Sequence, residues 1–119
     1  MNEEILFIDD DENIAELFAL TLSQGGHETL ALSGEVDVEH YFENISDNLK
    51  IVIADKNMPV INGAEVVRRF ESSPKAGTLK YIIISGDEEL DNDELQGKVH
   101  FIKKPFKKET LFSVIEDII

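Results

Sequence analysis

Five short apolar runs, at residues 5–8, 29–32, 51–54, 81–84 and 99–102, place the strongest constraint on how this chain folds. Three of them, at 5–8, 51–54 and 81–84, are apolar throughout rather than alternating with polar residues. Continuous apolar runs of this length are typical of strands buried on both faces, as in a parallel sheet covered by helices. We therefore predict five strands.

Segments with helical periodicity separate these runs. Apolar residues recur at i, i+3, i+4 and i+7 in them, and we expect the first two stripes to face the sheet. The stripes are Ile14, Leu17, Phe18, Thr21 and Leu22; then Val38, Tyr41, Phe42 and Ile45; then Val66, Val67 and Phe70; and last Leu111, Phe112, Ile115, Ile118 and Ile119. The helix expected after residue 84 is poorly marked.

Strands that alternate with helices predict one α/β domain over residues 1–119. Right-handed crossovers would give a doubly wound (βα)5 sandwich with a five-stranded parallel sheet. At 119 residues the chain is long enough for one core and too short for two ordinary domains.

The composition excludes several classes of function. With no cysteine and only three scattered histidines, the chain cannot hold zinc through sulfur. A net charge of −14 disfavours direct binding to nucleic acid or anionic membranes. No apolar run approaches the roughly 18 residues of a membrane span, and the first residues are acidic where a secretory signal would be basic. We expect a cytoplasmic protein.

Polar residues follow four of the five runs. They are Asp9, Asp10 and Asp11 after the first run, Asp55 after the third, Ser85 after the fourth, and Lys103, Lys104 and Pro105 after the fifth. Ligands of open α/β sheets bind outside the carboxyl ends of the strands, so these residues are the candidates for a functional site.

Clustered carboxylates at such an edge require a cation. They repel one another unless a hard ion neutralises them, and oxygen ligands alone favour Mg²⁺, Mn²⁺ or Ca²⁺. Mg²⁺ fits best, with Mn²⁺ as a possible substitute. A carboxylate is also a nucleophile, and Asp55 attacking a phosphoryl group would give an acyl phosphate. Lys104 and Ser85 would supply contacts to the phosphoryl oxygens.

The combination of these motifs resembles response-regulator receiver domains of two-component systems, over essentially the whole chain. The matching segments are Asp9-Asp10, Asp55-Lys56-Asn57-Met58-Pro59 with Gly63, Ser85-Gly86 and Lys104-Pro105-Phe106. Each motif alone is weak, but the four occur in order at successive strand ends. The resemblance implies a flavodoxin-like fold of the chemotaxis-regulator type.

The resemblance also implies roles for particular residues at the site. Asp55 would be the phospho-acceptor, and Asp10 with the backbone carbonyl of Asn57 would join it on Mg²⁺. Asp9 would assist through the water shell of the ion.

The remaining roles implied by the resemblance concern switching. Ser85 and Lys104 would bind the phosphoryl group, and the ring of Phe101 would turn into the space that Ser85 leaves. A core position explains Phe101 equally well. The peptide bond before Pro105 is expected to be cis.

The same resemblance predicts the partners. A sensor histidine kinase or a phosphotransfer protein would donate the phosphoryl group, and the chain would act on an unidentified output target as a monomer or weak dimer. It would modify itself rather than turn over a substrate. Because the sequence begins with Met1, we expect an N-terminal receiver, alone, trimmed from a longer regulator, or followed by an output domain.

One departure from the family lies between Ser85 and Lys104. Their separation is 104 − 85 = 19 residues, shorter than usual by about one helical turn. The segment 87–96 is also strongly acidic. We expect a short or irregular helix there and carry over no particular output partner.

The segment after the first run and the chain as a whole also allow other interpretations. Asp11 is better explained as a helix N-cap than as a ligand. A phosphatase of the haloacid dehalogenase type and a calcium-binding EF-hand both fail, because Asn13 and Ile14 stand where their motifs require other residues. A binding module that works without phosphorylation remains the alternative from another class.

Overall fold

A computed structural model of the chain describes residues 3–56, 58, 62–86 and 99–118. The elements, in chain order, are β1 (Ile5–Ile8), α1 (Glu12–Gln24), β2 (Thr29–Leu32), α2 (Glu35–Phe42), β3 (Ile51–Asp55), α3 (Gly63–Glu71), β4 (Lys80–Ser85), β5 (Val99–Lys103) and α4 (Lys108–Ile118). All five predicted strands are confirmed. The prediction of a short or irregular helix before β5 falls on residues outside those described, as does Ile119.

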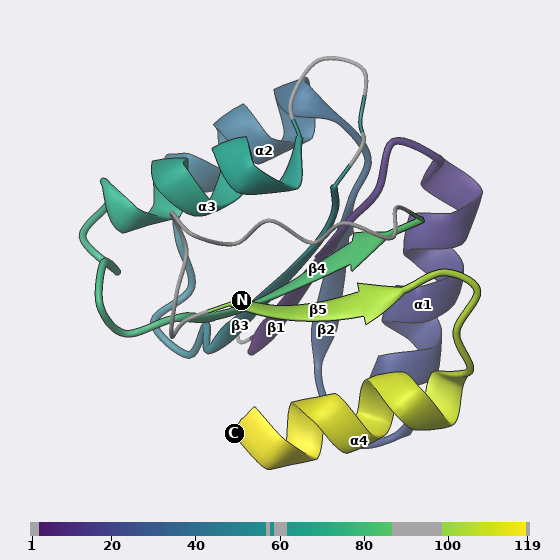
Figure 1. Cartoon of the computed structure of the whole chain (residues 1–119). Helices are drawn as coiled ribbons and strands as arrows, with labels where there is room; N and C mark the ends of the chain where they lie inside the picture. The colour runs from purple at the N-terminus through teal and green to yellow at the C-terminus, as the bar shows by residue number, and fades with distance from the viewer. Residues whose placement is uncertain (1–2, 57, 59–61, 87–98, 119) are drawn as a thin grey trace.

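The strands form one parallel sheet in the order β2-β1-β3-β4-β5. Figure 1 shows α2 and α3 over one face of the sheet and α1 with α4 over the other. This arrangement confirms the predicted doubly wound sandwich. It also makes β1, β3 and β4 neighbours, so that their carboxyl ends meet at one edge.

Two apolar clusters, one on each face of the sheet, hold the layers together. On the first face, Leu6 and Val52 of the sheet pack with Val38 of α2 and Val66 of α3. Successive side chains of a strand point to opposite faces, so β1 and β3 also contribute side chains to the second face. There they pack against α1 and α4. Strands β1 and β3 are buried along their whole length, which explains why their sequences are apolar throughout.

Helix α1 is rotated relative to the stripe predicted from its sequence. Leu17 is 59% exposed and Ile14 also lies on the outer side, whereas the buried residues are Ala15, Ala19 and Leu22. Two alanines in contact with the sheet let the helix backbone approach it closely, and this packing outweighs the burial of larger side chains. The prediction that Ile14 and Leu17 face the sheet was therefore wrong.

The other three stripes are largely confirmed. Val38 and Tyr41 of α2 are buried, as are the three members of the α3 stripe. In α4 the buried residues are Leu111 and Ile115. None of the helices in the described part of the chain combines the length and apolar character that crossing a bilayer requires.

Candidate functional site

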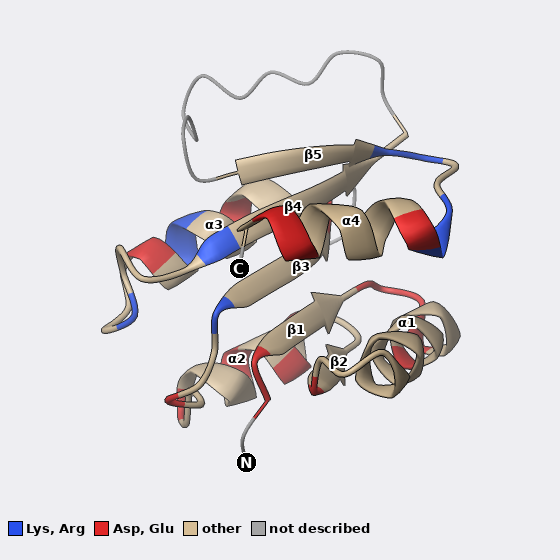
Figure 2. Cartoon of the chain, turned by 90° about the horizontal axis from the view of Figure 1, so that it is seen from below, with Lys and Arg blue, Asp and Glu red and all other residues tan. Residues whose placement is uncertain are grey.

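The ends of β1, β3, β4 and β5 bring the predicted site residues to one edge of the sheet. Asp55 is the last residue of β3 and pairs with Ile84, and Ser85 ends β4 opposite Lys103. Figure 2 shows the acidic segment after β1 and the lysine-bearing segment after β5 at the same end of the sheet. The edge therefore carries carboxylates beside an ammonium group.

Three carboxylates converge at this edge. Asp9, Asp10 and Asp55 each offer an oxygen, and these atoms all lie within 4.8 Å of one another. Asp9 and Asp55 are each only 7% exposed, whereas Asp10 faces solvent. The predicted clustering of these residues is confirmed. A set made of carboxylate oxygens alone fits a hard divalent cation such as Mg²⁺, with the exposed side left for water and further oxygen ligands.

Asp9 is held in place by the start of α1. Its Oδ1 accepts a hydrogen bond of 2.9 Å from the backbone N–H of Asp11, and its own N–H donates to the carbonyl of Leu32. Burial raises the pKa of the Asp9 carboxyl, and the negative charge of Asp55 raises it further. Asp11 caps α1 through hydrogen bonds from the N–H groups of Asn13 and Ile14, which confirms the N-cap interpretation.

Lys104 reaches over the edge to Asp55. Its Nζ lies 2.6 Å from Asp55 Oδ2, a short charge-assisted contact. The Lys104 side chain is 43% exposed and that of Asp55 only 9%. One carboxylate oxygen of Asp55 is therefore held by an ammonium group that remains accessible from solvent.

Backbone hydrogen bonds fix the two segments that carry Lys104 and Ser85. The N–H of Lys104 donates to the carbonyl of Ser85 over 2.7 Å, and the peptide bond before Pro105 is cis, as expected. Ser85 is fully buried. Phe101 is partly buried and packs with the cluster on the α2–α3 face, close to Ile83.

The predicted ligand Asn57 lies outside the described residues. Its neighbour Met58 is buried against the core. Asn62 caps helix α3, because its side-chain oxygen accepts a hydrogen bond from the N–H of Glu65. Gly63 begins the helix directly beneath the site, and a Cβ there would lie 3.0 Å from the carbonyl oxygen of Asp55.

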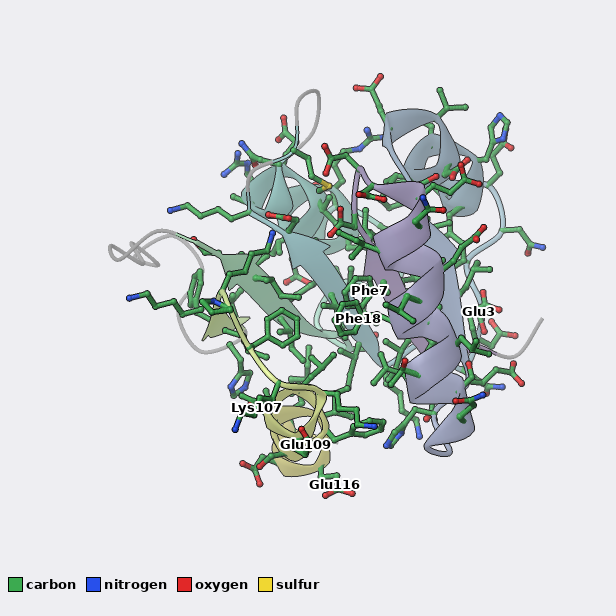
Figure 3. The ribbon with its side chains drawn as sticks, turned by 90° about the vertical axis from the view of Figure 1, so that its right-hand side faces the viewer. Glu3, Phe7, Phe18, Lys107, Glu109 and Glu116 are labelled. Carbon is green, nitrogen blue, oxygen red and sulfur yellow. The ribbon has the colours of Figure 1, made fainter. Side chains whose placement is uncertain are left out.

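An apolar cavity beside the carboxylates is a feature that the sequence interpretation missed. Phe18 of α1 stacks on Phe7 with ring centroids 5.0 Å apart and contacts Phe106 at 5.4 Å. Figure 3 shows Phe7 and Phe18 lying together beside α1. The cavity, of about 490 Å³, is also lined by Asp9 and Lys104. The sequence signal that could have indicated this cavity is Phe106, an aromatic residue that directly follows Lys104-Pro105.

Comparison with known proteins agrees with this geometry. The chain is 28% identical to the chemotaxis protein CheY homolog of Campylobacter jejuni, over 98% of this chain and 92% of the relative. It is 27% identical to a solved receiver domain protein from Clostridium thermocellum, with a TM-score of 0.80, and the match covers 98% and 94% of the two chains.

A second solved structure is the response regulator protein TrrA of Thermotoga maritima in complex with Mg(2+)-BeF. It is 24% identical, with a TM-score of 0.78 and coverage of 98% and 99%, and at this identity the likeness shows the fold alone. The family model described as "Response regulator receiver domain" matches residues 5–116. Because this match spans nearly the whole chain and the site residues occupy the expected strand ends, the protein belongs to the family of response regulator receiver domains.

Proposed function

We propose that Asp55 of this receiver domain accepts a phosphoryl group in a Mg²⁺-dependent reaction and that Asp9, Asp10 and Asp55 hold the ion. The observation that carries the proposal is the convergence of three carboxylates within 4.8 Å, with Lys104 in contact with Asp55. We propose that Asp10, Asp55 and the backbone carbonyl of Asn57 bind the ion directly and that Asp9 acts through its water shell. The Mg²⁺-BeF complex of TrrA supports this choice of ion.

We propose a direct displacement at phosphorus. A carboxylate oxygen of Asp55 attacks the phosphorus of a phosphohistidine on the donor, the P–N bond breaks, and the imidazole leaves with the electron pair and takes up a proton from water. A bound Mg²⁺ ion supplies positive charge to the phosphoryl oxygens. Lys104, already beside Asp55, exchanges its carboxylate contact for one with the new phosphate oxygens.

Ser85 and Phe101 are the residues that we propose to report the phosphorylated state. Ser85 is buried at the end of β4, next to Lys104 through a backbone hydrogen bond, so its hydroxyl needs only a short movement to reach a phosphoryl group on Asp55. Phe101 lies on the neighbouring strand in a partly buried position that a rotation of the ring can deepen. Such a movement would couple the phosphate to the surface at β5.

A sensor histidine kinase or a phosphotransfer protein is the proposed donor, in the cytoplasm. The CheY relative supports this class of partner. We propose that the chain modifies only itself, without turning over a separate substrate, that it does not bind nucleic acid, and that it works as a monomer or weak dimer. The high negative charge of the chain favours the last two points.

Intact-mass measurement after incubation with acetyl phosphate and MgCl2 tests the phosphorylation directly. Wild type should gain one phosphoryl group that is lost on treatment with hydroxylamine. Asp55→Asn should gain none, and a chelator should abolish the gain in wild type.

A phosphoryl group that appears on Asp55→Asn, or one that forms equally well with chelator, would contradict the proposed site or its dependence on the metal. Failure of folded wild type to react with either acetyl phosphate or beryllofluoride would favour the alternative, a binding module that works without phosphorylation.

A further inference from the structure

A groove lies at the opposite side of the molecule from β5, along the free edge of the sheet. It has a volume of about 660 Å³ and runs between β2, α2 and the loop that follows α2. We call it the β2-edge groove. Its lining residues are Glu3, Leu30, Ala31, Leu32, Asp37, His40, Tyr41, Asn44, Ile45, Ser46 and Asp47.

Glu3 is a buried carboxylate at the base of this groove. It is only 4% exposed, and its Oε2 accepts a hydrogen bond of 2.8 Å from the hydroxyl of Tyr41. Figure 3 shows Glu3 on the side of α1 away from Phe7 and Phe18. Within the described ranges, no lysine, arginine or histidine forms an ion pair with Glu3.

A buried carboxylate without a cation is costly for a fold. Tyr41 offsets part of that cost. Burial raises the pKa of its hydroxyl well above the ordinary range, and Glu3 adds to the rise, so Tyr41 stays protonated and continues to donate. Among the described residues Glu3 receives one side-chain hydrogen bond, from the neutral Tyr41 hydroxyl, and the groove gives a cation access to its carboxyl group.

The backbone of β2 is the second feature of the groove. Within the described sheet β2 pairs with β1 alone. The carbonyl of Leu32 accepts from Asp9 N–H and that of Glu28 from Ile5 N–H. The main-chain N–H and C=O groups of successive residues in a strand point to opposite sides. Those of the even-numbered residues of β2 therefore point toward β1, and those of the odd-numbered residues point away from the sheet.

Two of the outward groups are already satisfied. Thr29 N–H donates to Ser23 Oγ over 3.1 Å, and Ser33 N–H donates to Asp37 Oδ2 over 2.9 Å. Ala31 lies between them, and its N–H and C=O face the groove edge. An extended segment laid along β2 can therefore form a pair of main-chain hydrogen bonds at Ala31, as in strand addition.

We propose that the β2-edge groove binds an extended peptide segment of another protein that places a lysine or arginine on Glu3 and pairs its backbone with Ala31. Charge complementarity selects this occupant. The described residues that line the groove include Glu3, Asp37, Asp47 and His40, and none of them is a lysine or arginine. The same charge disfavours a second copy of this chain as the occupant, because two molecules of net charge −14 repel each other.

The site is separate from the proposed phosphorylation chemistry, so the test uses the unphosphorylated full chain. The probe is the blocked pentapeptide acetyl-VTRVT-amide, added to 15N-labelled protein and followed by NMR. We expect saturable shift changes confined to β2, α2 and the loop after α2. The matched peptide acetyl-VTQVT-amide should bind about tenfold more weakly, the loss expected for one charged hydrogen-bond partner.

Two protein variants with the same change of charge separate a specific site from general acidity. Glu3→Gln keeps an acceptor for Tyr41 and should weaken VTRVT binding about tenfold. Glu109→Gln on α4, far from the groove, should leave it unchanged. Equal effects of the two variants, or no effect of Glu3→Gln, would overturn the proposal. If Glu3→Gln fails to fold, the comparison of the two peptides decides alone.

The contribution of strand pairing has its own control. N-acetylarginine amide carries the same charge without a strand, and we expect it to bind about tenfold more weakly than the pentapeptide. If this amide or spermidine binds as tightly and with the same map of shift changes, the groove is a site for small cations and the peptide proposal is overturned. Absence of saturable binding by the pentapeptide overturns it as well.

Discussion

The carboxyl of Asp9 is held in an environment that disfavours its charge. Burial and the neighbouring Asp55 raise its pKa, while the N–H of Asp11 and the ammonium of Lys104 act against the rise. In the absence of a cation the folded state therefore carries a cost that the unfolded chain does not, first from burial of the Asp9 carboxylate and then from its repulsion by Asp55. A bound divalent ion would offset both contributions.

Asp9→Asn should stabilise the protein in the presence of a chelator and weaken its affinity for Mg²⁺. The asparagine retains the oxygen that accepts from Asp11 N–H, so only the charge is removed. Because Lys104 already offsets part of the charge and solvent reaches the site past the exposed Asp10, we expect a gain of roughly 0.5–1 kcal/mol in the free energy of unfolding. Urea unfolding with EDTA measures it, and a less stable variant would contradict the account of repulsion.

Gly63→Ala should destabilise the site from beneath. A Cβ at this position would lie 2.9 Å from Cδ1 of Ile83 and 3.0 Å from the carbonyl oxygen of Asp55. We expect the free energy of unfolding to fall by about 1–3 kcal/mol, as at other overpacked positions, although alanine has a better helix propensity than glycine. Gly86→Ala is the control, because a Cβ there meets nothing within 4 Å. Similar thermal stability of the two variants would refute this prediction.

At the scale of elements, a hydrogen-bonded link ties α2 to the chain before β1. The hydroxyl of Tyr41 donates to Glu3 and accepts from the N–H of Ser46, so one side chain joins three segments. Removing it leaves a buried carboxylate without its donor. The cost of such a loss is larger than that of a solvated hydrogen bond.

Tyr41→Phe should therefore lower the free energy of unfolding by about 1–3 kcal/mol. Tyr81→Phe provides the comparison. The hydroxyl of Tyr81 donates to Glu71 over 2.6 Å, but Glu71 is partly exposed and can be hydrated, so we expect a smaller loss of about 0.5–1.5 kcal/mol. Denaturant unfolding measures the loss of stability in each variant. A larger loss for Tyr81→Phe than for Tyr41→Phe would contradict the role assigned to Glu3.

Helices α2 and α3 are joined by an ion pair at the surface. Arg69 of α3 donates to Glu39 of α2 and lies 4.9 Å from the ring centroid of Phe42. The hydrogen bond from Arg69 lowers the pKa of the Glu39 carboxyl below its ordinary value of 4.5. A lowered pKa in the folded state means that the pair stabilises the fold above pH 4.5.

The coupling between Glu39 and Arg69 should then be lost as pH falls from 4.5 through the lowered pKa. A double-mutant cycle of Glu39→Gln and Arg69→Gln at neutral and acidic pH measures it. NMR titration should give Glu39 the lower pKa in wild type and its ordinary pKa in Arg69→Gln. An unchanged pKa in that variant would show that the pair is not formed in solution.

For the whole molecule, charge sets the response to ions. A net charge of −14 on 119 residues means that the compact state repels itself, and any salt should relieve part of that repulsion. A divalent ion at the carboxylate cluster acts in addition, because it binds the folded state alone. The two effects can be separated by matching ionic strength.

MgCl2 at about ten times its dissociation constant should raise the free energy of unfolding by about 1.4 kcal/mol beyond NaCl of equal ionic strength. For a domain of this size the corresponding rise in Tm is about 5 °C. Asp10→Asn should lose the additional stabilisation by MgCl2 and keep the stabilisation by NaCl. Identical responses of wild type to the two salts would argue against a metal site at Asp9, Asp10 and Asp55.

The sequence alone predicted the five strands, the α/β class and the residues at the strand ends. These features follow from local patterns: a continuous apolar run specifies a buried parallel strand, and a polar residue where such a run ends must lie at the carboxyl edge. The N-cap at Asp11 was predicted for the same reason, since capping chemistry acts over a few residues.

Only the tertiary structure decided which strands are neighbours and which face of α1 is buried. The order β2-β1-β3-β4-β5 brings Asp9, Asp10 and Asp55 together, and it depends on packing between segments far apart in the chain. The same is true of Ala15 and Ala19, which displace larger residues from the sheet. Glu3 and Tyr41 are 38 residues apart, and no local pattern predicts their contact, because close packing of a core is a property of the assembled layers.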